Sequence, residues 1–247
     1  MGYFKGLCPL ITLDGAALEI YIVRHGLSEA NEKKILQGGI DFPLSDEGRR
    51  QAHHVGMYFS ERGIHFDKVV TSILSRARET AEIILSYQEN SPSLEEEEQF
   101  KEIDTGDLQG LTMDEVRDKY PSYYMRSYMG WLDFSEFGGE NWEELYARVD
   151  KAMQKYILPE EQMGDGRLLL VVHGGVIRAM LRSLSGVSVN FMFLRVANCS
   201  QMKINHIMAQ GQVRRYIEYF LPLSETLVGG KPFVHGISEE ERDKLVS

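Results

Sequence analysis

The sequence predicts an α/β fold in which helices cover both faces of a central, mostly parallel sheet. Short apolar runs each lead into an amphipathic helix, and two alternating runs near the C-terminus have the pattern of a hairpin. With 247 residues, 43% of them hydrophobic, the chain is long enough to bury a large core. We therefore expect one three-layer α/β/α sandwich over residues 1–247, with residues 1–17 as a variable N-terminal extension.

The first expected strand covers residues 18–23, an apolar run that ends abruptly at a polar sequence. A helix is expected to follow between Ser45 and Gly63. Ser45 suits the N-cap position, the apolar side chains from Ala52 to Phe59 recur with helical spacing, and Gly63 suits the position after the last turn. This strand and helix form the first unit of an alternating pattern.

The order of strand and helix then recurs. Further strands are expected at 68–71 and 168–172, and the helices that follow them at 75–85 and 176–184. Residues 201–208 and 213–219 alternate between apolar and polar side chains around an Ala209-Gln210-Gly211 turn, which predicts a hairpin. Since the two strands of a hairpin are antiparallel, the sheet is expected to be mixed.

Two segments fit the alternating pattern less well. The acidic run Glu95–Glu98 is interpreted as a solvated surface segment without a function. The stretch from Tyr120 to Trp142 is rich in aromatic side chains but has no helical or strand period along its whole length. Those aromatic side chains are expected either to pack into the core or to form a lid.

Composition restricts the partners and the compartment. The chain has 27 Lys and Arg residues against 37 Asp and Glu residues, a formal net charge of -10 that disfavours diffuse binding to nucleic acid or anionic membranes. No run reaches the ~20 apolar residues of a membrane helix, and the first residues lack the apolar core of a signal peptide. Only Cys8 and Cys199 are present, so we expect no disulfide framework and a cytoplasmic location.

Arginine and histidine side chains follow the expected strands at the points where these end. Arg24 and His25 come directly after the first strand, His173 follows the third, and Arg76 opens the helix after the second. Parallel sheets bind ligands at the carboxyl ends of their strands, so these side chains should meet at one edge. Two guanidinium groups can hold a phosphate through paired hydrogen bonds, and the Asn31 amide can donate another. The pattern predicts a pocket for a phosphoryl group.

Each of these residues alone also has a simpler structural explanation. A histidine at a strand end can satisfy nearby backbone groups, and Arg76 can be a surface charge. The shared placement of His25 and His173 favours a site over these alternatives. The other histidines lack the compact spacing of zinc ligands, so neither a metal nor a cofactor is expected.

Five ordered segments sharpen this interpretation. They are Arg24–Asn31, Gln37-Gly38 with Asp41–Gly48, Ser72–Ala77, Lys101–Leu111 and Val171–Gly175. On these segments the sequence resembles the histidine phosphatase superfamily, also called the phosphoglycerate mutase-like family, from about Leu18 to Tyr219. The resemblance implies a phosphoglycerate mutase-like fold.

The resemblance also implies roles for individual residues. It implies that His25 is the nucleophile and becomes a phosphohistidine, and that Glu102 protonates the leaving alkoxide and then activates water. Arg24, Arg76 and His173 would stabilise the charge on the transferred phosphoryl group, without a metal. The substrate-binding residues that the sequence predicts are Arg24, Asn31, Gln37, Gly38, Arg76, His173 and Gly174.

The acceptor of the phosphoryl group decides between related activities. The 71 positions from Glu102 to His173 resemble the shorter phosphatase branch, and Phe137–Trp142 resembles its Gly-Gly-Glu-Ser segment, with Asn141 in place of Ser. We therefore expect a metal-independent phosphomonoester hydrolase that acts on a small phosphorylated metabolite. A phosphoglycerate mutase-type phosphotransferase is the alternative, and a catalytically silent phospho-ligand binding module is a second one. Whether the chain forms a homodimer stays open.

Overall fold

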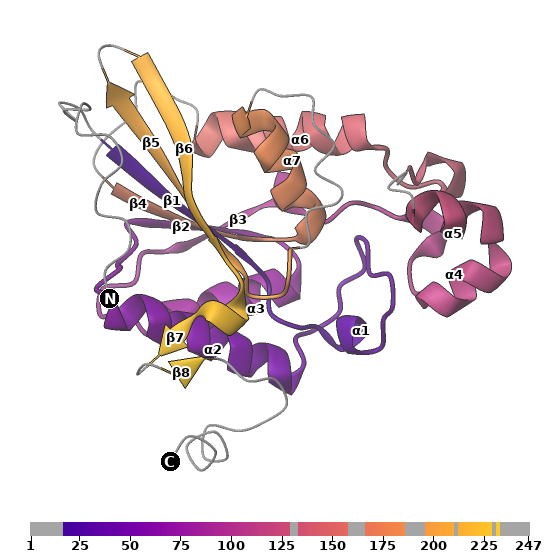
Figure 1. Ribbon diagram of the computed structural model, residues 1–247, viewed down its shortest axis with the longest axis horizontal. Helices are drawn as coiled ribbons and strands as arrows, with labels where there is room; N and C mark the ends of the chain where they lie inside the picture. Colours follow the sequence, from indigo (N-terminus) through magenta and orange to yellow (C-terminus); the bar gives the residue numbers. More distant parts are fainter. Residues whose placement is uncertain are drawn as a thin grey trace.

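A mixed sheet runs through the middle of the protein (Figure 1). The computed structural model describes residues 17–128, 133–157, 166–185, 196–209, 212–228 and 231–232. Within these ranges, six strands pair in the order β3-β2-β4-β1-β5-β6. Their bounds are β1 Ala17–Arg24, β2 Lys68–Ser72, β3 Leu94–Glu97, β4 Gly166–Val172, β5 Gln201–Ala209 and β6 Gln212–Leu221. A separate short ladder joins β7 (Leu227–Val228) to β8 (Lys231–Pro232).

The strand directions confirm the prediction of a mixed, mostly parallel sheet. Strands β1 to β4 pair in parallel, whereas β5 runs antiparallel to β1 and forms the expected hairpin with β6. Arg24 lies opposite Val172 in the register of β1 and β4. These two strands therefore end at the same level, and His25 and His173 leave the sheet side by side.

Helices cover both faces of the sheet, as predicted. Figure 1 shows α2 and α3 on one face, α6 and α7 on the other, and α4 and α5 away from the sheet. The α-helices of the described residues are α1 Glu29–Glu32, α2 Asp46–Glu61, α3 Ser75–Leu85, α4 Met113–Lys119, α5 Pro121–Tyr128, α6 Trp142–Tyr156 and α7 Gly174–Ser185. Short 3-10 helices are η1 Glu98–Phe100, η2 Gly106–Leu108, η3 Ser135–Phe137 and η6 Leu223–Glu225.

Side chains of β1 show how the sequence divides the core between the two faces. Ile20 and Ile22 belong to the apolar cluster that includes α6 and α7, whereas Tyr21 and Val23 belong to the cluster that includes α2 and α3. Successive side chains of a strand point to opposite faces, so a central strand covered on both sides is apolar throughout.

The helix boundaries are partly as predicted. Ser45 caps α2, and its side chain accepts a hydrogen bond from the Gly48 amide at 3.2 Å. Helix α7 begins at Gly174, two residues before the expected start at Val176, because the two glycines after His173 already form its first turn. Helix α5 lies in the aromatic stretch and α6 begins at its last residue, Trp142, and the sequence analysis assigned neither helix.

The acidic run Glu95–Glu98 lies at the surface, as interpreted, but most of it also belongs to the sheet. Leu94–Glu97 forms the edge strand β3, parallel to β2. Glu95 forms ion pairs with Lys68 at 3.1 Å and Lys155 at 3.0 Å, and its carboxylate also accepts from the Tyr156 hydroxyl. These partners come from β2 and α6, far away in the sequence, so the acidic run alone does not reveal them.

The aromatic stretch contributes to the core. Tyr123 of α5 and Phe134 are both buried in the cluster of α6 and α7. Phe137 packs edge-on against Tyr123, with 4.9 Å between the ring centroids.

Some predictions lie outside the described residues: the N-terminal extension up to residue 16, the turn at 210–211 and the aromatic residue Trp131. Across the part of the chain that is described, no helix has the length and apolar character needed to cross a membrane.

Candidate active site

His25 and His173 lie side by side at the carboxyl edge of the sheet. Their side chains are buried, with 1% and 0% of the residue surface exposed. The ring centroids are 5.0 Å apart and the ring planes form an angle of 57°. The structure thus brings together the two histidines that the sequence placed at separate strand ends.

The orientation of His25 leaves one ring nitrogen with a lone pair. Its Nδ1 lies 2.7 Å from the backbone carbonyl oxygen of Gly26. Because a carbonyl oxygen only accepts, Nδ1 carries the proton and Nε2 is the basic nitrogen. Burial lowers the pKa of His25 well below its usual value, and the charges of Arg76 and Arg24 lower it further. His25 is therefore neutral at pH 7, as a nucleophile must be.

His173 is held by a hydroxyl group. Its Nε2 lies 2.8 Å from Ser72 Oγ, and its Nδ1 is buried without a hydrogen-bond partner among the described residues. Burial lowers the pKa of His173 well below its usual value, and the charges of Arg76, Arg24 and Arg148 lower it further. The sequence analysis left the charge of His173 open; in this structure the side chain is neutral near pH 7.

Arg76 and Arg24 supply the fixed positive charge of the pocket. Arg76 is fully buried, and its guanidinium donates to the carbonyl oxygens of Ile40 at 2.9 Å and Gly38 at 3.1 Å. Arg24 donates to the Val196 carbonyl oxygen at 2.5 Å. The Nε of each arginine is buried and has no partner within the described parts of the chain. Each guanidinium therefore keeps a desolvated N–H group that can donate to an anion.

The Glu102 carboxylate lies against the first turn of α7, the helix that follows His173. Its Oε1 accepts from the backbone amides of Ile103 and Gly175, each at 3.1 Å. A Cβ atom on Gly175 would lie 2.5 Å from that oxygen. Glycine is therefore needed at position 175, because a Cβ atom there would displace the Glu102 carboxylate.

Three of the predicted substrate-binding residues make structural contacts around the pocket. Asn31 Oδ1 accepts from the side-chain amide of Asn198 at 3.2 Å. Gln37 Oε1 accepts from Ser28 Oγ at 2.8 Å, and the Gly38 carbonyl oxygen is the acceptor of Arg76 described above. These contacts are all with other protein groups, and the roles of Asn31, Gln37 and Gly38 in binding substrate stay predictions.

Gly174 is the fourth of these residues. It lies beside Arg24 and Arg178, because a Cβ at this position would be 3.7 Å from Arg24 Nε and 3.6 Å from a terminal nitrogen of Arg178. Its predicted role in substrate binding is likewise untested by these contacts.

The sequence analysis missed several residues that shape the site. The Asn198 side chain donates to the backbone carbonyl oxygens of His25 at 3.0 Å and Gly26 at 3.2 Å, and so fixes the loop that carries the nucleophile. Arg178 of α7 is partly buried, and this burial lowers its pKa while Glu102 raises it. A charged residue one turn after a predicted strand-end histidine is a usable signal for Arg178, whereas nothing local marks Asn198.

No group of three or more His, Cys, Asp or Glu residues among those described lies close enough to hold a metal ion.

Comparison with known proteins shows the family of this chain. A sequence model described as the histidine phosphatase superfamily, branch 1, matches residues 20–218. The chain belongs to the histidine phosphatase superfamily. This assignment confirms the resemblance inferred from the five ordered segments.

Members that resemble this chain include both phosphatases and mutases. A broad-specificity phosphatase of Saccharomyces cerevisiae is 36% identical over 173 residues, which are 69% of this chain and 72% of that protein. A 2,3-bisphosphoglycerate-dependent phosphoglycerate mutase of Parvibaculum lavamentivorans is 34% identical over 170 residues, 68% of this chain and 80% of that protein. The crystal structure of a phosphoglycerate mutase from Bacillus anthracis superposes with a TM-score of 0.70 at 25% identity, covering 83% of this chain and 94% of that one. The fold is therefore phosphoglycerate mutase-like, as predicted.

Proposed function

We propose that this protein is a metal-independent phosphomonoesterase that moves the phosphoryl group of a small phosphorylated metabolite first to His25 and then to water. The observation that carries the proposal is the hydrogen bond from His25 Nδ1 to the Gly26 carbonyl oxygen. It leaves the lone pair of Nε2 for attack on phosphorus, within a pocket where two arginines have unused donor groups.

In the first step, Nε2 of His25 bonds to phosphorus while the bond from phosphorus to the ester oxygen breaks. Glu102 gives its proton to that oxygen, so the leaving group departs as a neutral alcohol. In the second step, the Glu102 carboxylate takes a proton from water, the water oxygen bonds to phosphorus, and the bond to Nε2 breaks. Inorganic phosphate leaves, and both side chains return to their initial states.

The two arginines complement the charge of the phosphoryl group. Arg24 and Arg76 lie close enough to His25 for each to lower its pKa. The Nε atom of each guanidinium is buried, so solvent compensates these charges poorly and they stabilise the negative charge spread over the phosphoryl oxygens during transfer. His173, neutral beside them, can donate a hydrogen bond to one of these oxygens without adding a further charge.

A mutase activity is the alternative, and the 34% sequence identity to a phosphoglycerate mutase supports this alternative. The two activities differ only in the acceptor, because a second substrate hydroxyl would replace water in the second step. A silent phospho-ligand binding module is less well supported, because His25, Arg76, Glu102 and His173 are all present. We therefore favour the hydrolase.

The experiment follows the phosphoryl group. Wild-type protein is incubated with 32P-labelled phosphate esters, including 2,3-bisphosphoglycerate, with and without 3-phosphoglycerate as acceptor. We expect an acid-labile phosphohistidine at His25 and release of label as inorganic phosphate. Faster transfer of label to 3-phosphoglycerate than to water would establish the mutase instead. The absence of a labelled intermediate, together with equal rates in wild type and His25→Ala, would exclude both enzymatic activities.

A further inference from the structure

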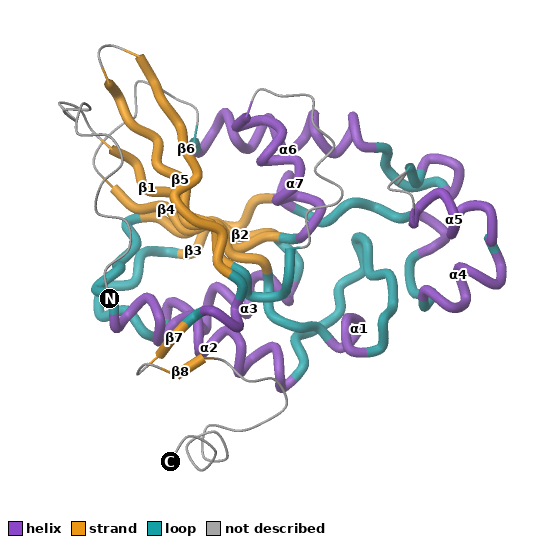
Figure 2. The backbone as a smooth tube through the Cα atoms, viewed as in Figure 1, coloured by secondary structure: helices purple, strands orange, loops and turns teal. Residues whose placement is uncertain are grey.

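The backbone that carries Glu102 has little regular structure of its own. Glu102 lies between the short helices η1 and η2, in a connection that Figure 2 shows mainly as loop. A general acid has to be held within a fraction of an ångström of the oxygen that it protonates, and a displacement of about 1 Å can cost ~100-fold in rate. Some other part of the protein must therefore hold this segment in place.

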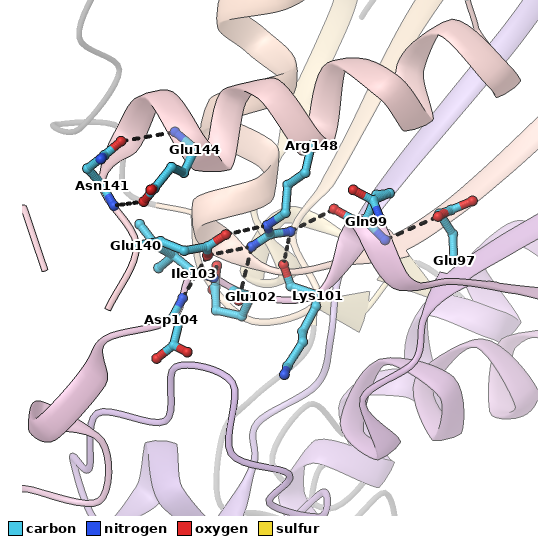
Figure 3. A network of polar contacts seen from close by, with 10 residues as sticks. All are labelled: Glu97, Gln99, Lys101, Glu102, Ile103, Asp104, Glu140, Asn141, Glu144 and Arg148. Carbon is cyan, nitrogen blue, oxygen red and sulfur yellow. Dashed lines mark hydrogen bonds and ion pairs between the residues drawn. The ribbon is translucent and has the colours of Figure 1, made fainter. Parts of the chain in front are cut away.

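Arg148 of α6 binds the segment from one side (Figure 3). Its Nη1 donates to the carbonyl oxygens of Gln99 at 2.7 Å and Lys101 at 2.6 Å, and its Nη2 donates to the carbonyl oxygen of Glu102 itself at 3.2 Å. One planar guanidinium thus satisfies three carbonyl groups within four consecutive residues.

Glu140 orients that guanidinium and also binds the chain beyond Glu102. Its carboxylate accepts from Arg148 Nε at 2.7 Å and Nη2 at 2.9 Å, a paired contact between the two side chains (Figure 3). Oε2 of Glu140 also accepts from the Asp104 amide at 2.9 Å, and the Glu140 amide donates to the Asp104 carbonyl oxygen at 2.9 Å. The pair therefore holds the backbone on both sides of Glu102.

The ion pair of Arg148 and Glu140 is largely shielded from solvent. The side chains of Arg148 and Glu140 are only 17% and 22% exposed. Burial opposes the ionised form of Glu140, but hydrogen bonds from Arg148 and from the Asp104 amide lower the pKa of this carboxyl overall. Paired, charge-assisted hydrogen bonds of this kind are stronger and more directional than an exposed ion pair.

Both anchors of Glu102 come from helices that pack on each other. Leu145 and Val149 of α6 are fully buried in the same apolar cluster as Val176 and Met180 of α7. Helix α6 binds the backbone of Glu102 through Arg148, and the first turn of α7 binds its carboxylate through the Gly175 amide.

We infer that Arg148 and Glu140 are positioning residues for the acid-base chemistry of Glu102. They hold the backbone of residues 99–104 so that the Glu102 carboxylate faces the ester oxygen above His25. The inference rests on the proposed function, in which Glu102 protonates the leaving group. Both residues contact the backbone around Glu102. The charge of Arg148 also lowers the pKa of His173, and Arg148→Lys keeps that charge.

The test uses variants that keep the charge or the shape of the pair. Arg148→Lys keeps the positive charge, but a single ammonium nitrogen cannot reach three carbonyl oxygens and a carboxylate in this geometry. Glu140→Gln keeps the side-chain size and loses the paired acceptor. Arg182→Lys is the matched control, because the partners of Arg182 of α7 are Glu143 of α6, at 3.4 Å, and the ring of Tyr146 of α6, with 3.9 Å from Arg182 Cζ to the ring centroid. Thermal unfolding of each variant checks that it folds, and Glu140→Gln carries the test if Arg148→Lys does not fold.

The measurement is kcat/KM for phosphate esters whose leaving groups differ in basicity. An alkoxide needs a proton in order to leave, whereas 2,4-dinitrophenolate leaves without one. We expect Arg148→Lys and Glu140→Gln to lower kcat/KM for an alkyl phosphate by ~10- to 100-fold, and for 2,4-dinitrophenyl phosphate by less than ~3-fold. Glu102→Gln should show the same selectivity, and adding Arg148→Lys to it should cause little further loss. Arg182→Lys should leave both values unchanged.

The outcomes separate this inference from the proposed function. If wild-type hydrolysis of both esters does not depend on His25, the proposed function fails and the inference falls with it. If hydrolysis depends on His25 but the Arg148 and Glu140 variants fold and lose activity equally on both esters, or lose none, the function stands and the positioning role is overturned.

Discussion

His25 and His173 share one desolvated space, with 5.0 Å between their ring centroids and Arg76 lowering the pKa of both. Two imidazolium ions at this distance, beside a buried guanidinium, would repel strongly. The pocket therefore favours two neutral rings. This arrangement suits a nucleophile, and it links the stability of the protein to pH.

Stability should fall as the pH drops below 6.5. The folded-state pKa values of both histidines lie below 6.5, so in the window between those values and 6.5 the unfolded chain binds more protons than the folded one. The free energy of unfolding then rises with pH through this window and levels off above it, by up to about 1.4 kcal/mol per pH unit for each histidine. Urea unfolding between pH 5 and 7.5 measures the slope. His25→Asn should reduce it, and an equal slope in this variant would contradict the assignment.

Ser72→Ala should impair both His173 and the fold. The Ser72 hydroxyl is fully buried at the end of β2 and lies 2.8 Å from His173 Nε2. Without it, a buried ring nitrogen loses its partner, at a cost of about 1–3 kcal/mol in the free energy of unfolding. We also expect kcat to fall by ~10-fold, because the ring is free to turn away from the phosphoryl oxygens. Chemical unfolding and steady-state kinetics test the two effects, and unchanged values for both would show that the contact is unimportant.

Gly175→Ala should displace the Glu102 carboxylate. The new Cβ would lie 2.5 Å from Glu102 Oε1, so the carboxylate must move away from the amide that holds it. We expect a loss of ~10- to 100-fold in kcat/KM for alkyl phosphates. Gly174→Ala is the comparison, since its Cβ would meet only ordinary contacts at 3.6 Å and beyond. The prediction fails if Gly174→Ala costs more activity than Gly175→Ala.

Much of the sheet and its site could be predicted because the signals are local. The apolar runs before His25 and His173 are buried on both faces of the sheet. Their uninterrupted apolar character alone predicts buried strands. Parallel strands end at a common edge, so residues at separate strand ends could be placed together before any contact was known. The positions of the strand ends were therefore enough to predict that these side chains form one pocket.

What could not be predicted depends on contacts between distant segments. Edge strand β3 reads as a charged run, because Glu95 and Glu97 are compensated by Lys68, Lys155 and Tyr156 from other elements. Arg148 lies 46 positions from Glu102, and its sequence neighbourhood is that of an ordinary amphipathic helix. Its function in the site follows from the packing of α6 on the 99–104 segment.

Gly26→Ala should destabilise the protein through a backbone clash. A Cβ at Gly26 would lie 2.5 Å from the carbonyl oxygen of Gly48, in the first turns of α2. The Gly26 amide also donates to Thr80 Oγ1 at 3.0 Å, so the loop is held between α2 and α3 and has little freedom to shift. Forcing a methyl group into such a contact costs about 1–3 kcal/mol, and the adjacent His25 would move with the loop. We expect a lower thermal midpoint and a lower yield of phosphohistidine per folded molecule. Wild-type stability in Gly26→Ala would mean that α2 can move away from the loop, and that the close approach of the two backbones is not what keeps His25 in place.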